Sequence, residues 1–227
     1  MNKNTSELEN KIDYIFNNKE LVTKALTHSS YTNDRKMSKN MCNERLEFLG
    51  DAVLELLSSD FLYEKYPDKA EGELTKLRAS LVSEKPLAAV ARQIGLGEFL
   101  FLGHGEERTG GRKRDSVTSD AVEALLGAIY LDGGMEKAKT FALKYILNDI
   151  ENKHMFYDSK TILQELIQKY HKGVLRYDLV KDEGPDHEKN YGVNATIDGK
   201  IAGYGEGRTK KAAEQEAAYN AIKSLKK

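Results

Sequence analysis

The chain has 227 residues, of which 40% are hydrophobic and 31% charged, so it can build a packed core and wholesale disorder is excluded. Its 35 basic and 36 acidic side chains give a net charge of −1, which by itself indicates no polyanionic partner. The single cysteine excludes an internal disulfide framework and a zinc site of several thiolates. We find neither a long apolar run nor the layout of a secretory signal, and therefore expect a cytoplasmic protein with no membrane partner.

Composition and the spacing of apolar residues divide the chain into two parts. Residues 1–152 are rich in Ala, Leu, Glu and Lys, with apolar residues at helical spacing, and this pattern predicts an all-helical domain. Within it, residues 103–111 are rich in glycine and predict a mobile loop before the basic run at residues 112–114. The polar residues 153–157 are expected to form a linker.

An acidic stripe marks the first informative helix, residues 43–57, which read NERLEFLGDAVLELL. At about 100° per residue, Glu44, Glu47 and Asp51 share one face, and Glu55 continues it. The predicted apolar face consists of Leu46, Leu49, Val53, Leu56 and Leu57. Carboxylates one turn apart repel each other, so this stripe requires solvent, basic side chains or a divalent cation.

The second acidic helix is predicted at residues 119–131, where Asp120 and Glu123 share a face. Leu125, Leu126 and Ile129 point away from that face, and the Ala and Gly positions allow close helix packing. If both apolar faces join one core, the two acidic stripes meet in an oxygen-only cluster suited to Mg²⁺ or Mn²⁺. The alternative is two ordinary solvated faces, and spacing alone leaves both interpretations open.

Residues 158–227 predict a second, α+β domain. A helix at 159–171 is followed by strands at 175–180, 191–197 and about 200–205 and by a helix at 209–225. Asp198-Gly199 predicts a hairpin turn between the last two strands. The expected order is therefore αβββα.

Polar groups follow one face of the 159–171 helix, formed by Thr161, Gln164, Glu165 and Gln168. The complementary apolar face is formed by Ile162, Leu163, Leu166, Ile167 and Tyr170. Lys210 and Lys211 begin the last helix, where free backbone N–H groups favour a phosphate, although an ordinary solvated lysine pair is the alternative. His187 follows a Gly-Pro-Asp turn that could present it.

The run NERLEFLGDAVLEL resembles the signature of ribonuclease III, and the resemblance continues through residues 25–28, 71–75, 110–116 and 119–132. Val117-Thr118-Ser119 departs from the more apolar lead-in of that family. The order GPDH, GxG, KKAAEQEAA in turn resembles the double-stranded-RNA-binding domain. The resemblance implies a multidomain chain in which an all-α ribonuclease III endonuclease domain precedes an αβββα double-stranded-RNA-binding domain.

The resemblance also implies a function: Mg²⁺-dependent cleavage of double-stranded RNA, with Mn²⁺ able to substitute and no organic cofactor. The products would carry 5′-phosphate and 3′-hydroxyl ends with short 3′ overhangs. The enzyme would work as a homodimer with the signature helix at the interface, in processing of ribosomal RNA precursors and messenger RNA.

Site residues follow from the same resemblance. The implied metal ligands are Glu47, Asp51, Asp120 and Glu123, among which Asp51 and Glu123 are expected to be catalytically essential, with Glu44 and Glu71 as auxiliary acidic groups. The implied RNA contacts are Thr161, Gln164, Glu165, Gln168 and His187 in minor grooves and Lys210 and Lys211 on phosphates. His28 and Cys42 are interpreted as structural.

Two rival functions use the same residues. The chain could bind double-stranded RNA without cutting it, but its complete acidic set argues against this. It could instead be a metal-dependent phosphohydrolase of small nucleotides, which would leave the second domain unexplained.

Overall fold

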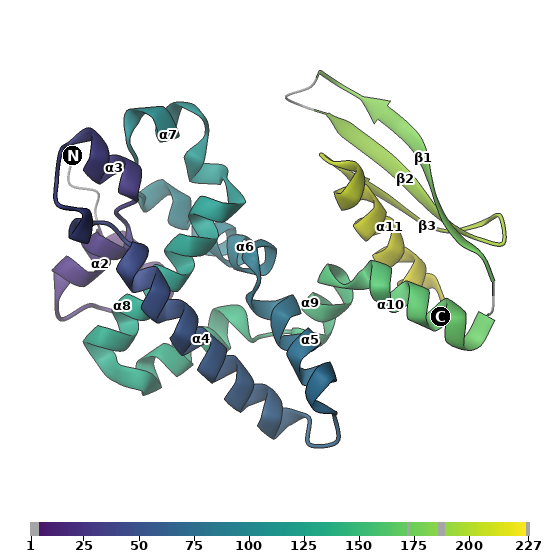
Figure 1. Cartoon of the computed structure of the whole chain (residues 1–227), viewed down its shortest axis with the longest axis horizontal. Coiled ribbons are helices and arrows are strands. Elements are labelled where there is room, and N and C mark those ends of the chain that lie inside the picture. Colours follow the sequence, from purple (N-terminus) through teal and green to yellow (C-terminus); the bar gives the residue numbers. More distant parts are fainter. Residues whose placement is uncertain (1–4, 172, 186–188, 226–227) are drawn as a thin grey trace. The chain divides into compact units, whose positions relative to one another are not determined.

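The structure is a computed structural model that describes residues 5–171, 173–185 and 189–225. It divides into two compact units, Met1–Asn148 and Asp149–Lys227, which Figure 1 draws in purple to teal and in green to yellow. The division lies a few residues before the expected boundary. Residues 153–157, expected as a linker, belong to helix α9 (Ile150–Tyr157) of the second unit.

Apart from an isolated β-bridge between Thr27 and Phe101, the regular structure described in the first unit is helical, as the sequence predicts. Its α-helices are α1 (Thr5–Ile12), α2 (Lys19–Ala25), α3 (Ser29–Asp34), α4 (Glu44–Lys65), α5 (Glu71–Val82), α6 (Glu84–Ile94), α7 (His104–Arg108) and α8 (Asp115–Phe141). Short helical segments lie at η1 (Lys39–Met41), η2 (Leu96–Phe99), η3 (Gly111–Lys113) and η4 (Ala142–Ile146). Among the described residues, no helix combines the length and apolar character that crossing a bilayer requires.

Helix α8 is the centre of this unit and packs against α2, α4 and α6. Leu125, Leu126 and Ile129 are fully buried, which confirms the predicted apolar face. On α4, Leu46, Val53 and Leu57 are buried as expected, and Leu49 is partly buried. Leu56 was wrongly predicted to be buried: it is 56% exposed, because the fully buried Leu54, about 200° away around the helix, takes the core position.

Two glycines allow α4 and α8 to touch along their backbones. A Cβ atom on Gly50 would lie 1.8 Å from the backbone oxygen of Glu123, and one on Gly127 would lie 2.3 Å from the backbone oxygen of Leu46. No side chain fits at either position, so the two helices cross more closely than helices that interpose side chains. The residues flanking Gly50 on α4 are thereby brought to α8.

Helix α8 is broken at Gly134, whose φ of 79° lies in the left-handed region that favours glycine. Just before the break, the Asp132 carboxylate accepts hydrogen bonds from the Tyr14 hydroxyl (2.7 Å) and from the backbone N–H groups of Asn17 (2.9 Å) and Asn18 (2.8 Å). This carboxylate ties the middle of α8 to the segment that leads into α2.

The segment at residues 103–111 was wrongly predicted to be a loop, since it contains helix α7. Arg112 donates to the backbone oxygens of Gly97 and Leu100, each at 2.8 Å, and forms an ion pair with Glu107. Arg114 forms an ion pair with Glu106 at 2.5 Å. Two arginines of the basic run thus hold this segment in place, which the glycine content of the sequence concealed.

The second unit has the predicted α+β composition. It contains α9, α10 (Ser159–Leu166), the π-helical turn η5 (Ile167–His171), β1 (Leu175–Glu183), β2 (Asn190–Ile197), β3 (Lys200–Gly207) and α11 (Lys210–Leu225). The strands form an antiparallel sheet in the order β1-β2-β3. Asp198 and Gly199 have φ of 50° and 77°, which confirms the predicted hairpin turn, and a bulge interrupts β1 between Leu179 and Lys181.

Helix α11 packs on one face of this sheet. Helical spacing predicts that Ala213, Ala217, Ala221 and Leu225 dock this helix on the sheet; the three alanines are fully buried, but the prediction for Leu225 was wrong, since it is 39% exposed at the end of the helix. A Cβ atom on Gly205 of β3 would lie 2.2 Å from the backbone nitrogen of Ala217. Small residues on both sides therefore bring helix and strand together. Tyr170 was wrongly assigned to the apolar face: it lies in the π-helical turn, whose wider winding shifts the register, and is 65% exposed.

Substituting Gly50 by Ala should lower the free energy of unfolding by about 2–4 kcal/mol, because the methyl group overlaps the α8 backbone and the helices must separate. Chemical denaturation of the full chain measures this change. The matched control is Gly72→Ala on α5, where a Cβ atom meets nothing within 4 Å. That change should be neutral or stabilise by about 0.5–1 kcal/mol, and equal losses in both variants would contradict the backbone contact.

Candidate active site

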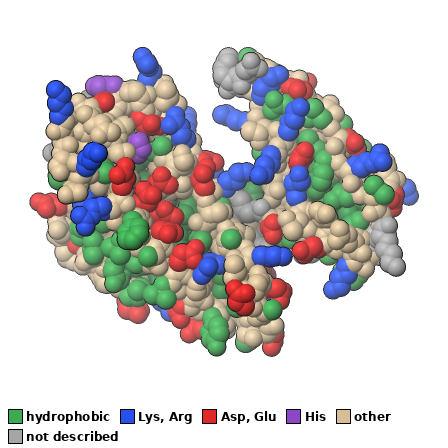
Figure 2. Space-filling model, in the orientation of Figure 1, with side chains coloured by type: hydrophobic (Ala, Val, Ile, Leu, Met, Phe, Trp, Pro, Cys, Tyr) green, Lys and Arg blue, Asp and Glu red, His purple; other side chains and the backbone are tan. Residues whose placement is uncertain are grey.

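The close crossing of α4 and α8 builds an acidic cluster. Glu47 and Asp51 flank Gly50 on α4, while Asp120 and Glu123 lie one turn apart on α8, so the glycine contact brings the two pairs together. One carboxylate oxygen from each of Glu47, Asp120 and Glu123 lies within 4.8 Å of the others. Figure 2 shows acidic side chains gathered on this face of the first unit, beside an apolar area.

Burial and mutual repulsion change the acidity of the cluster. The pKa of Glu123 is raised to about 8, first by desolvation and then by the charges of Asp51, Asp120 and Glu47. Desolvation and the charge of Asp120 also raise the pKa of Glu47. Desolvation raises the pKa of Asp120 too, against a hydrogen bond from Ser119 that lowers it. The raised pKa values show that ionising these carboxylates together is unfavourable, and a bound cation would reduce that repulsion.

The donor set fits a hard divalent cation. Glu47, Asp120 and Glu123 are partly buried, so each keeps an oxygen accessible while its position is fixed by a helix. Carboxylate oxygens are the ligands that Mg²⁺ and Mn²⁺ prefer. Asp51 lies outside this three-residue group and is exposed, but its charge acts on both Glu47 and Glu123. Asp51 is therefore close enough to affect the acidity of the cluster, although it is not one of the three converging carboxylates.

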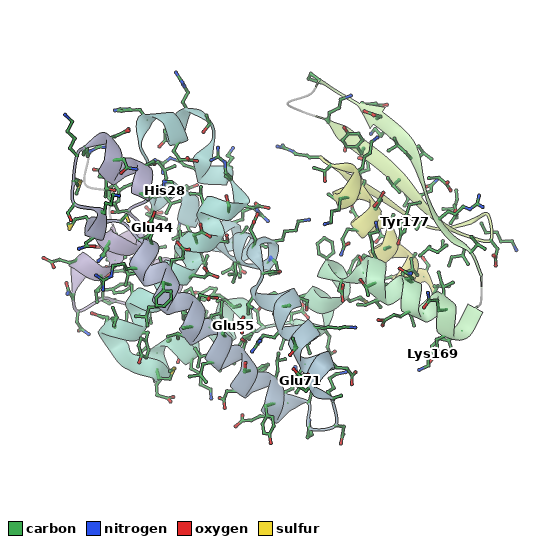
Figure 3. The ribbon with its side chains drawn as sticks, in the orientation of Figure 1. His28, Glu44, Glu55, Glu71, Lys169 and Tyr177 are labelled. Atoms are coloured by element: carbon green, nitrogen blue, oxygen red, sulfur yellow. The ribbon has the colours of Figure 1, made fainter. Side chains whose placement is uncertain are left out.

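The auxiliary acidic residues lie apart from each other. Glu44 is exposed on α4 and its charge contributes to the raised pKa of Glu47. Glu71 lies on α5, well separated from Glu44 in Figure 3, and accepts a hydrogen bond from the Thr75 hydroxyl at 3.0 Å. It lines a groove of about 730 Å³ between α4 and α5 and is not part of the three-residue group.

The two residues interpreted as structural are hydrogen-bonded within the fold. His28 caps the start of α3: its Nδ1 accepts from the backbone N–H of Ser30 at 3.3 Å and lies 2.8 Å from the Ser30 hydroxyl. Cys42 is buried and its thiol donates to the backbone oxygen of Lys39. Both geometries agree with the structural interpretation, although the charge of His28 also lowers the pKa of Asp120.

Sequence reasoning missed several groups around the cluster. Ser119, part of the departure from the family pattern, donates to Asp120 at 3.3 Å, and the charge of Glu84 raises the pKa of Asp120. Arg78 on α5 forms an ion pair with Glu55 at 2.9 Å. Because Ser119 directly precedes Asp120, the sequence could have predicted their contact. The contacts of Glu84 and Arg78 join different helices, so only the packing of those helices reveals them.

The polar face of the second unit is exposed. Thr161, Gln164 and Glu165 lie on the solvent side of α10, opposite the buried Leu163, and Gln168 follows in η5. Lys210 and Lys211 are exposed at the start of α11, where the Thr209 hydroxyl accepts from the backbone N–H of Ala212 at 3.1 Å. His187 lies outside the described residues.

Comparisons with known proteins agree with this architecture. A family model described as Ribonuclease-III-like matches residues 18–150, and a double-stranded RNA binding motif matches residues 159–225. The chain belongs to the ribonuclease III family. It is 49% identical to Ribonuclease 3 of Pelotomaculum thermopropionicum (95% of this chain, 90% of that protein) and 45% identical to Ribonuclease 3 of Bacillus licheniformis (97% and 90%).

A solved structure supports the fold of the first unit. The nuclease domain of ribonuclease III from Campylobacter jejuni is 47% identical, with a TM-score of 0.59, and the match covers 63% of this chain and 96% of that one. Family membership and these relatives make the chain an endoribonuclease with a helical nuclease domain and a double-stranded-RNA-binding domain. The predicted family and fold class are confirmed.

Metal binding should depend on pH because Glu123 has a pKa of about 8 in the metal-free chain. Below that pH an ion must displace the carboxyl proton, so the affinity for Mn²⁺ should rise by about tenfold per pH unit from pH 6 and level off above pH 8. Titration of Mn²⁺ by electron paramagnetic resonance measures this dependence. Glu123→Gln should remove most of this pH dependence. An affinity of the unsubstituted chain that does not change with pH would contradict the prediction.

The stability of the metal-free chain should also depend on the ionisation of Glu123, but it should fall as pH rises, whereas the affinity for metal rises. The folded pKa of Glu123 lies above its ordinary value of 4.5, so its stabilising contribution is complete below about pH 4.5 and is lost as pH rises to about 8. Millimolar Mg²⁺ should therefore raise the melting temperature of the chain more at pH 8 than at pH 6, which thermal unfolding measures.

Proposed function

We propose that this ribonuclease III cleaves double-stranded RNA with Mg²⁺ held by Glu47, Asp51, Asp120 and Glu123. The observation that carries the proposal is the meeting of carboxylate oxygens from α4 and α8 within 4.8 Å. Mn²⁺ fits the same oxygen donors and is proposed as a substitute. Glu44 acts from outside by adding to the negative charge around Glu47.

The chemistry follows from the donor set. When bound, Mg²⁺ lowers the pKa of a coordinated water and stabilises charge on phosphate oxygens. Glu47, Asp120 and Glu123 would hold the ion, and the exposed Asp51 would complete the ligand set from the solvent side. Attack by water on the phosphorus, with the P–O3′ bond breaking and the O3′ oxygen leaving as a hydroxyl, gives 5′-phosphate and 3′-hydroxyl ends, whereas attack by a ribose 2′-hydroxyl would give a cyclic phosphate. Asp51 and Glu123 are proposed to be essential for this step.

The second unit is proposed to supply affinity for the duplex. Its exposed amide and hydroxyl groups, from Thr161, Gln164 and Gln168, can donate to and accept from 2′-hydroxyl groups in a minor groove, with Glu165 beside them. Lys210 and Lys211 meet phosphates at the start of α11, where free N–H groups add to their charge. These contacts depend on A-form shape rather than sequence.

An exposed apolar surface supports a homodimer. Phe48 on α4 is 80% exposed and Leu131 on α8 is 54% exposed, and both line a groove of about 720 Å³ that also includes Leu49. Leu56, near the same face of α4, is exposed as well. The related nuclease domain from C. jejuni is described as structurally flexible in a region involved in dimer formation. We propose that a second copy of this chain covers this surface.

Two copies place two active centres on one duplex, one for each strand, and offset cuts would leave short 3′ overhangs. Processing of ribosomal RNA precursors and messenger RNA is proposed as the task, on the ground of membership in the ribonuclease III family. The single cysteine, which is buried and free, supports a cytoplasmic location.

Glu123→Gln and the double change Lys210→Ala, Lys211→Ala should separate chemistry from binding. The first should reduce cleavage of a labelled duplex in Mg²⁺ by at least about a thousandfold while duplex affinity stays within twofold, because only the metal cluster changes. The second should weaken binding and reduce the salt slope by about 1–2 units. Gel analysis and binding titrations at several salt concentrations measure both.

The charge-matched control for the lysine pair is Lys200→Ala with Lys223→Ala, two exposed lysines elsewhere on the second unit. It should leave the salt slope within about 0.5 unit of that of the unsubstituted chain. Intact duplex after incubation of the unsubstituted chain with Mg²⁺ would refute the nuclease function. Equal loss of binding in both test variants would refute the division of roles.

Phe48→Gln with Leu56→Gln should convert the dimer to a monomer, since each exposed side chain buried in the interface contributes about 1.5–3 kcal/mol. Analytical ultracentrifugation measures the change. Ile15→Gln, at a residue that is also exposed but lies in the segment between α1 and α2, is the control and should leave the dimer intact. A monomeric unsubstituted chain at micromolar concentration would contradict the proposed assembly.

A further inference from the structure

Glu55 extends the acidic face of α4 beyond the proposed metal ligands. It lies four residues after Asp51, one turn along the helix, and Figure 3 shows it farther along α4 than Glu44. Its charge adds to the repulsion that raises the pKa of Glu123. Glu55 is therefore close enough to affect the cluster, although it is not part of the three-residue group.

Arg78 of α5 holds this carboxylate at a fixed place. Its Nε lies 2.9 Å from Glu55 Oε2, and its Nη1 donates to the Ser59 hydroxyl at 2.7 Å. The Ser59 hydroxyl in turn donates to the backbone oxygen of Glu55 at 2.6 Å. One guanidinium thus binds α4 at two points one turn apart, a geometry that the planar fork of arginine allows and a lysine does not.

We propose that Arg78 is a positioning residue of the metal cluster, which it serves by holding the Glu55 carboxylate away from the ions. The inference rests on the proposed metal-dependent cleavage. Glu55 lies one helical turn past Asp51 and its charge acts on Glu123, and the ion pair with Arg78 gives its carboxylate another partner. The ligand set then stays limited to Glu47, Asp51, Asp120 and Glu123.

Loss of Arg78 has a defined chemical consequence. The freed Glu55 carboxylate adds an unpaired negative charge that acts on Glu123, and it would offer one more oxygen donor one helical turn from Asp51. Metal ions bind more tightly, because the attraction to the cluster increases. Cleavage slows, because an additional carboxylate takes a coordination position that water or phosphate oxygen needs. Neither effect requires that the fold change.

A double-mutant cycle on the full chain tests the proposal, with Mn²⁺ binding measured by electron paramagnetic resonance in the absence of RNA. Arg78→Ala should tighten Mn²⁺ binding by about three- to tenfold, whereas Glu55→Gln alone should weaken it by a smaller factor, because it removes an acidic charge near the cluster and leaves the Arg78 cation unpaired. The double variant should return to within twofold of the unsubstituted chain. The same tightening by Arg78→Ala in both backgrounds would overturn the proposal, because Arg78 would then act only through its own charge.

Cleavage supplies the second readout. At saturating Mg²⁺, Arg78→Ala should lower kcat about tenfold with KM for duplex RNA within twofold, and Glu55→Gln should restore most of the loss. Equal kcat losses in the single and double variants would also overturn the proposal. Lys139→Ala, which removes the 2.9 Å ion pair with Asp60 on the same helix, is the control and should change neither quantity.

A failure of the Arg78 proposal can be distinguished from a failure of the proposed function and from misfolding of a variant. If the unsubstituted chain does not cut duplex RNA, the proposed function fails, while the Mn²⁺ cycle still decides the role of Arg78. Thermal unfolding checks that each variant is folded. Arg78→Met keeps the length of the side chain without its charge and gives the same expected shifts if Arg78→Ala does not fold.

Discussion

The contact between the backbones of α4 and α8 is the constraint on which the rest of the nuclease unit depends. Gly50 and Gly127 let the helices cross where any side chain would collide with the facing backbone. The same contact forces carboxylates of both helices together, although they repel each other. The fold therefore uses the packing energy of one apolar core to assemble a charged group that would not form in solution.

The electrostatics of this group are consistent with the proposed division of roles between the two units. Partly buried carboxylates with raised pKa values repel the phosphates of RNA unless a cation is present. Affinity for a polyanion must come from elsewhere, and Lys210 and Lys211 lie exposed on a separate unit. A net charge near zero for the whole chain hides this separation of an acidic cluster on one unit from exposed lysines on the other.

Much of this arrangement could be predicted from the sequence, because periodicity determines which residues share a helical face. It assigned Glu47 and Asp51 to one acidic stripe and Asp120 and Glu123 to another, and it identified the three strands. It could not place Arg78 against Glu55, since the two residues lie on different helices and only tertiary packing brings them into contact.

Other errors have equally physical causes. The glycines of residues 103–111 suggested a loop, but ion pairs from Arg112 and Arg114 stabilise α7. Leu56 and Tyr170 were assigned by counting around a regular helix, and a different core register and a π-helical turn moved them to the surface. The sequence also contains no sign of the bulge in β1, which affects the exposed edge of the sheet. The bulge lies in the pairing of β1 with β2 and increases the local twist of β1, an edge strand that carries the exposed Leu179 and Val180. A twisted edge is a poorer template than a flat one for pairing with a β-strand of another molecule.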